Sequence, residues 1–212
     1  MNMTPAFDYA QARIQARYGE RPEATVWMSL EQINDFGRYL HQVKATGLSP
    51  WVEKLGASSD AHEIETSLRQ AFRSHVQEVA GWAPDHWEAA ILWFGVLIDL
   101  ERFHAIVNGR KLPDWIPDDV SQSTGRGVED WRRAWRDRWP LKNGPDYNDL
   151  GLLEELLPVA SHEEIPVSRV DRIFRRCSRR PPGLFSYLVL VLGDVMRLRG
   201  GLVRRLSFGR GN

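Results

Sequence analysis

Residues 91–107 read ILWFGVLIDLERFHAIV, and this stretch decides the fold class. Residues 91–98 are apolar on every side of a helix, which is typical of a helix buried at the centre of a bundle. Pro84 is a natural start for this helix, and Asn108-Gly109 is a natural end. We therefore predict a long central helix with other helices packed around it.

Three further stretches carry apolar stripes at helical spacing. The first follows a capping-box pattern at Ser29 and Gln32 and comprises Leu30, Ile33, Phe36, Leu40 and Val43. The second follows Ser59 or Asp60 and comprises Ile64, Leu68, Phe72, Val76 and Val79. The third comprises Leu184, Leu188, Val191, Val195, Leu198 and Leu202, and we expect Gly200-Gly201 to kink or end its helix. Since no window alternates with a period of two, we predict an all-α, multi-helix bundle of eight to nine helices with essentially no sheet.

Length and composition indicate a folded protein of one or two domains. The 212 residues are 42% hydrophobic, and residues 111–127 are rich in Pro, Asp, Ser and Gly. We predict helical units over 1–110 and 128–212, joined by an irregular connection at 111–127, or one continuous domain. The single Cys177, the lack of a signal-peptide pattern and the short apolar runs favour a soluble, cytoplasmic protein.

Charge is unevenly distributed along the chain. The segment from residue 169 to 212 holds eleven Arg and two Asp, a net charge of +9, although the whole chain is neutral. Either this segment folds against the acidic remainder, or it contacts acidic lipid headgroups or the acidic loops of a membrane ring. Few aromatic residues lie among the Arg residues, which argues against nucleic acid. The candidate interface residues are Arg172, Arg175, Arg176, Arg179 and Arg180.

Three tryptophans recur at positions i, i+4 and i+8. Trp131, Trp135 and Trp139 would form a ridge on one face of a helix. Core packing is the default interpretation for such a ridge. The alternative is that Trp131 and Trp135 form an exposed binding surface for a partner helix.

Two segments of the chain resemble each other. LWFGVLIDLERFHAIVNG ends at residue 109, and YLVLVLGDVMRLRGGLVRRLSFG ends at residue 209. Each contains an apolar run, one Asp (Asp99 or Asp194) and, three residues later, an Arg (Arg102 or Arg197). This echo suggests a duplicated helical unit. At this spacing each Asp and Arg would form an ion pair of structural rather than catalytic importance.

The sequence offers no pattern for catalysis or for a cofactor. Neither HExxH, nor a P-loop or Rossmann glycine pattern, nor a Gly-x-Ser-x-Gly elbow occurs. We therefore predict neither catalytic residues nor metal or cofactor ligands.

Three places in the chain resemble the C/d family of central-stalk rotor proteins in V-type and A-type rotary ATPases. They are the opening helix with Tyr9, Arg13 and Arg17, the stretch from Leu40 to Trp51 followed by DAHEIETSLRQAF, and the repeated element around Asp99 and Asp194. The chain departs from the family in three ways. It lacks about one helical unit near residues 111–127, it has Arg102 and Arg197 where the family has Asn, and its Trp ridge is foreign to the pattern.

The resemblance implies a funnel-shaped stack of helical bundles on the cytoplasmic face of a membrane proteolipid ring. It implies a non-catalytic central-stalk subunit that couples the axle to the ring for proton or sodium transport, with axle subunits and the proteolipid ring as partners. Neither a cofactor, nor nucleic acid, nor a small-molecule substrate is expected. Two alternatives remain. One is an unrelated helical adaptor that binds through the Trp ridge, and the other is a small helical enzyme, which would need a deep pocket with a converging polar cluster.

Overall fold

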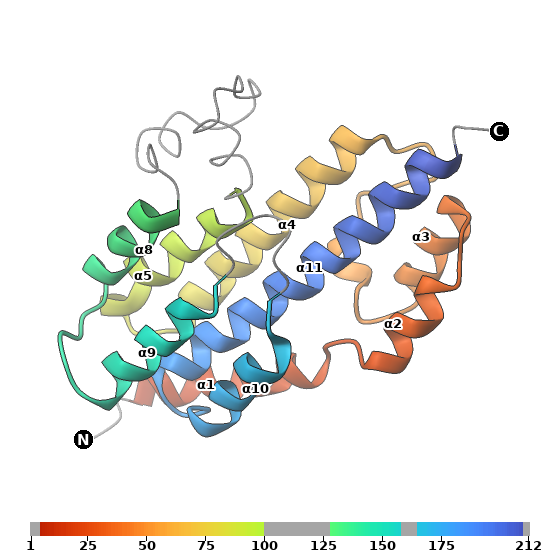
Figure 1. The fold of residues 1–212 in the computed structure, drawn as a ribbon. Helices are drawn as coiled ribbons and strands as arrows, with labels where there is room; N and C mark the ends of the chain where they lie inside the picture. The colour runs from red at the N-terminus through yellow and green to blue at the C-terminus, as the bar shows by residue number, and fades with distance from the viewer. Residues whose placement is uncertain (1–4, 100–127, 158–164, 210–212) are drawn as a thin grey trace.

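The computed structural model describes residues 5–99, 128–157 and 165–209 (Figure 1). Within these ranges the chain forms nine α-helices and no strand, so the predicted all-α bundle is confirmed for the described residues. The helices are α1 (Pro5–Gly19), α2 (Ala24–Glu31), α3 (Phe36–Lys44), α4 (Ala61–Ala80), α5 (Asp85–Phe94), α8 (Val128–Asp137), α9 (Pro145–Glu155), α10 (Val167–Arg176) and α11 (Pro181–Gly209). Two short 3-10 helices, η1 (Ser49–Trp51) and η2 (Gly95–Asp99), complete the described elements.

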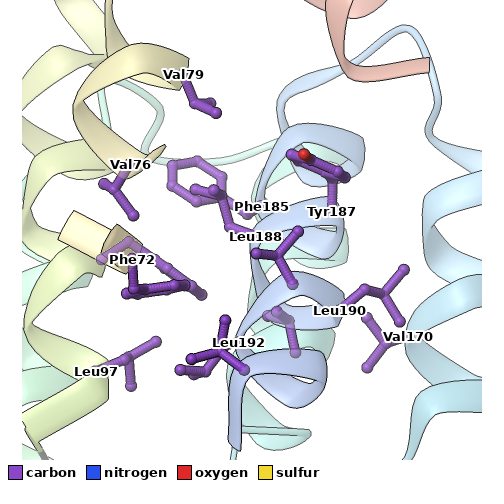
Figure 2. Packing of buried hydrophobic residues seen from close by; sticks show 14 of the residues in the cluster. Phe72, Val76, Val79, Leu97, Val170, Phe185, Tyr187, Leu188, Leu190 and Leu192 are labelled. Atoms are coloured by element: carbon purple, nitrogen blue, oxygen red, sulfur yellow. The ribbon is translucent and has the colours of Figure 1, made fainter. Parts of the chain in front are cut away.

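The central helix of the described bundle is α11, not the helix that contains residue 91. Residues 184–192 of α11 are all buried, and the helix packs against α1, α3, α4, α9 and α10. Figure 2 shows Phe185 and Leu188 facing α4, while Leu190 lies toward Val170 of α10. By length and composition α11 could cross a membrane, but 72% of its most apolar window is buried inside the molecule. That burial is the property expected of a core helix.

The predicted long helix over 91–107 is interrupted. α5 ends at Phe94, η2 follows, and residues 100–107 lie outside the described part of the chain. Leu92 is 40% exposed, so α5 is not covered on every side. Gly95 lies at the junction, where a Cβ would be 3.7 Å from Val76 of α4.

The predicted helix through Leu30 and Val43 is two helices. α2 ends at Glu31 and α3 begins at Phe36. The Asp35 side chain caps α3 by accepting a hydrogen bond from the Arg38 amide at 2.8 Å, which defines a new helix start.

α4 agrees with the prediction. Asp60 and Glu63 form a complete capping box at its start, and all five residues of its predicted stripe are buried. This stripe packs against α11 and α5, so the capping signal and the core contact favour the same helix.

The pair Gly200-Gly201 does not end α11, which continues to Gly209. Tyr39 of α3 packs against this part of the helix, and a Cβ on Gly201 would lie 2.9 Å from the Tyr39 Cζ. The buried Arg205 guanidinium lies 3.8 Å from the centre of the Tyr39 ring and donates to the Leu30 carbonyl at the end of α2. Gly201 therefore allows a close approach between α3 and α11.

Candidate binding cavity between α1, α4 and α11

A cavity of about 340 Å³ opens between the end of α1, the segment around η1, and the facing sides of α4 and α11. Its walls are both polar and aromatic. They include Arg17, Glu20, Arg21, Leu48, Trp51, Lys54, Ser67, Gln70, Ser74, His75, Glu78, Tyr187 and Asp194.

His75 and Tyr187 form a hydrogen-bonded pair in this lining. The His75 Nε2 lies 2.9 Å from the Tyr187 hydroxyl, and the Trp51 ring meets the His75 ring edge-on at 5.4 Å. Burial lowers the pKa of His75 and raises the pKa of Tyr187, because it disfavours the charged form of each. Both groups are therefore neutral at pH 7, and this part of the cavity is polar without being charged.

Paired charges surround the His75–Tyr187 pair. Arg17 contacts Glu20 at 3.1 Å and Glu78 at 3.3 Å. Arg21 donates two hydrogen bonds to the Asp194 carboxylate, at 2.7 and 3.1 Å. Burial raises the pKa of Asp194 even though Arg21 acts in the opposite direction. Loss of water therefore outweighs the attraction of the ion pair at this carboxylate.

The chemistry of the cavity suits binding better than covalent catalysis. The hydroxyl that bonds His75 belongs to Tyr187, whose raised pKa makes it a poor nucleophile at neutral pH. Among the described residues, no group of three His, Cys, Asp or Glu side chains is arranged to hold a metal ion. What the cavity offers is an aromatic wall, neutral hydrogen-bonding groups and balanced charges.

Three segments that are far apart in the sequence meet at this cavity. Arg17 comes from the opening helix, Trp51 from the segment that follows Leu40, and Asp194 from α11. Sequence reasoning did not find His75 or Tyr187. One sequence signal could have indicated His75. It follows Phe72 by three positions, at the edge of the apolar stripe of α4, where a polar side chain can face a cavity.

The predicted ion pair between Asp194 and Arg197 is replaced by pairs between helices. Asp194 pairs with Arg21, while Arg197 pairs with Glu31 and lies over the Trp27 ring at 4.7 Å. The Asp194 side chain is only 13% exposed and therefore requires a charged partner, and Arg21 reaches it from the segment that follows α1.

Asp99 of η2 is also paired with arginines of another helix. Its carboxylate is fully buried and accepts from Arg69 at 2.7 Å and also from Arg73, both on α4. Its predicted partner, Arg102, lies outside the described residues.

The Trp ridge belongs to the core. Trp131 and Trp135 are fully buried, and Phe94 of α5 meets both rings edge-on, at 6.1 and 5.7 Å. The prediction that Trp131 and Trp135 form a partner interface is therefore wrong, because neither side chain reaches the surface. An adaptor that binds through this ridge would need Trp131 and Trp135 to leave the core.

The arginine cluster is partly neutralised by the rest of the chain. Arg176 pairs with Asp149 at 2.6 Å, and Arg180 pairs with both Asp149 and Asp146. Arg175 pairs with Asp171 at 2.8 Å. Two members, Arg172 and Arg179, are exposed and form no ion pair with any described residue. Of the five arginines in the predicted interface, Arg172 and Arg179 therefore remain without an ion-pair partner among the described residues.

Cys177 lies at the end of α10 beneath these arginines. It is fully buried, and burial raises the pKa of its thiol, which donates to Asp149 at 3.3 Å. This is the environment of a structural rather than a reactive cysteine.

No protein-family model matches the chain, and neither a curated protein nor a solved structure matches it. What the chain does therefore has to be inferred from its own cavity and surfaces.

Proposed function

We propose that the chain is a non-catalytic central-stalk subunit of a V/A-type rotary ATPase, which couples the axle to the proteolipid ring during proton or sodium transport. One observation carries this proposal. Arg17, Trp51 and Asp194, one from each of the three segments that resemble the C/d family, line the same cavity.

This shared location supports the proposal, because residues that serve only to pack the fold need not line the same cavity. Trp51 is only partly buried, and Lys54 and Gln70 beside it are exposed and joined by a 3.2 Å hydrogen bond. An accessible aromatic surrounded by polar groups is typical of a place where a protein partner docks. We therefore propose that the cavity receives a side chain from a neighbouring protein of the stalk or ring.

Co-expression tests the proposed role directly. The tagged chain would be produced with the axle subunits and the proteolipid ring, and the complex would then be solubilised in detergent and purified through the tag. The proposal predicts that axle and ring subunits are recovered together with the chain. If the chain is well folded but elutes free of both, the rotary-ATPase role is wrong.

A matched pair of substitutions on α4 tests the cavity. Gln70→Arg brings a long cation into the cavity beside Lys54, whereas Gln77→Arg makes the same change at an exposed position of α4 outside the cavity lining. Gln and Arg have similar helix propensities, so both variants should fold. Gln70→Arg should reduce recovery of the axle and ring proteins, and Gln77→Arg should not. Equal recovery with both variants would remove the cavity from the proposal.

A further inference from the structure

α10 has two faces of opposite character. Val170, Ile173 and Phe174 are buried against the bundle. Arg169, Arg172 and Arg176 are exposed, and their i, i+3, i+7 spacing places them together on the opposite side of the helix. Because α10 packs closely against α11, its apolar face is already occupied, whereas its arginine face is exposed in the part of the chain that the structure describes.

Some of these arginines are compensated within the chain and some are not. Arg175 and Arg176 are held by Asp171 and Asp149. Arg169, Arg172 and Arg179 are exposed, and none of them forms an ion pair in the part of the chain that the structure describes. Arg169 and Arg172 lie on α10 and Arg179 lies in the turn that follows it, and we call these three residues the α10 arginine patch. Within eleven residues of sequence it presents three guanidinium groups that have no carboxylate partner among the described residues.

The composition of the patch indicates what it binds. Val167, 48% exposed, is the one large apolar side chain among the exposed residues of α10. A protein partner is usually held by buried aromatic or aliphatic anchors, and single-stranded nucleic acid by stacking on aromatic rings. An anionic bilayer requires neither, because its lipids move laterally to meet fixed cations and guanidinium groups bind phosphate oxygens in pairs.

We propose that the α10 arginine patch docks this protein on the surface of an anionic phospholipid membrane, with Arg169, Arg172 and Arg179 against the headgroups. The contact is peripheral, since Val170, Ile173 and Phe174 of α10 and most of α11 are buried inside the bundle. It stands on the charges of α10 and of the turn that follows it, and it does not require the rotary-ATPase role.

Co-sedimentation of the isolated chain with vesicles tests the proposal. Vesicles of phosphatidylcholine mixed with phosphatidylserine are compared with vesicles of phosphatidylcholine alone. The protein should sediment with the anionic vesicles and be released as the salt concentration rises, because screening weakens the attraction. The variant R169Q/R172Q/R179Q should lose about 100-fold in partitioning, at roughly fivefold for each arginine.

A control variant removes the same charge from other surfaces. Arg38, Lys142 and Arg204 are exposed and form no ion pair among the described residues, so R38Q/K142Q/R204Q has the same net charge as the patch variant. It should retain most of the binding. Unfolding curves for both variants would establish that each is folded.

Three outcomes would overturn the proposal. The first is equal sedimentation with neutral and anionic vesicles, and the second is equal loss of binding in the two variants. The third is failure to bind anionic vesicles while a single-stranded oligonucleotide or an acidic peptide binds through the patch, which would identify a different class of partner.

Discussion

Two neighbouring glycines of α11 allow a sharp test of the packing between α3 and α11. Gly200 is exposed, and a Cβ added there meets nothing within 4 Å. A Cβ at Gly201 would lie 2.9 Å from the Tyr39 Cζ and 3.3 Å from an Arg205 nitrogen, and even closer to the Tyr39 hydroxyl. Tyr39 is 2% exposed and has the Arg205 guanidinium against its ring, so the ring cannot turn aside freely.

The two substitutions to alanine should therefore change the free energy of unfolding by amounts that differ in sign or size. Replacing a helical glycine by alanine stabilises a helix by about 0.8–1.0 kcal/mol, and Gly200→Ala should gain up to that amount. Gly201→Ala gains the same stabilisation from helix propensity, but overpacking of the tight contact with Tyr39 costs about 1–3 kcal/mol. The free energy of unfolding of Gly201→Ala should thus lie about 1–3 kcal/mol below that of Gly200→Ala.

Urea unfolding followed by circular dichroism and by tryptophan fluorescence would measure this difference. The double variant Gly201→Ala/Tyr39→Phe serves as an internal check, because removing the hydroxyl relieves part of the clash and should recover part of the loss. If Gly201→Ala is as stable as Gly200→Ala, Tyr39 does not pack on α11 as described, and the account of this contact is refuted.

Three further predictions concern buried groups. Asp99→Ala leaves two arginines without their buried carboxylate and should lower the free energy of unfolding by about 3–5 kcal/mol in a urea titration. The control is Asp130→Ala, because Asp130 forms a looser 3.5 Å pair with an exposed arginine. This control should lower the free energy of unfolding by less than about 1 kcal/mol. Trp135→Ala should lower the free energy of unfolding by about 3–5 kcal/mol. Leu152 is 46% exposed, so Leu152→Ala should lower it by about 0.5 kcal/mol or less. Similar losses of stability in the two variants would contradict a buried Trp ridge. Burial lowers the pKa of His75 below its ordinary 6.5, so the contribution of His75 to stability is complete above pH 6.5 and is lost as the pH falls through the lowered pKa. Relative to His75→Gln, the wild-type chain should therefore become less stable on acidification below pH 6.5, and parallel pH profiles would refute this.

The sequence was sufficient where a local signal and the core contact agree. At α4, Asp60 and Glu63 mark the start and the apolar stripe marks the buried face, and the structure has both. Between α2 and α3 the apolar spacing continues in phase from Leu30 to Val43, so periodicity alone could not reveal the break. The overlooked signal was Asp35, a good capping residue directly before the buried Phe36.

The cavity could not be predicted from local patterns. The i,i+3 rule considers a single helix, and it paired Asp194 with Arg197. In the structure the partner of Asp194 is Arg21, which comes from the opposite end of the sequence. His75 and Tyr187 likewise meet only because α4 and α11 pack side by side. Such pairings depend on tertiary packing, which neither spacing nor composition encodes.

The position of α11 has a consequence for how the protein is made. The helix around which the others pack is encoded after all of them, so the apolar faces of α1, α3 and α4 emerge from the ribosome well before their partner exists. At about 5–20 residues per second, roughly 10–40 s separate the synthesis of α1 from that of residue 209. During that interval the apolar faces that pack on α11 lack this partner, and transiently exposed apolar surface of this kind favours aggregation. Substitutions in α11 should consequently lower the yield of soluble protein in cells more than their effect on equilibrium stability alone would suggest.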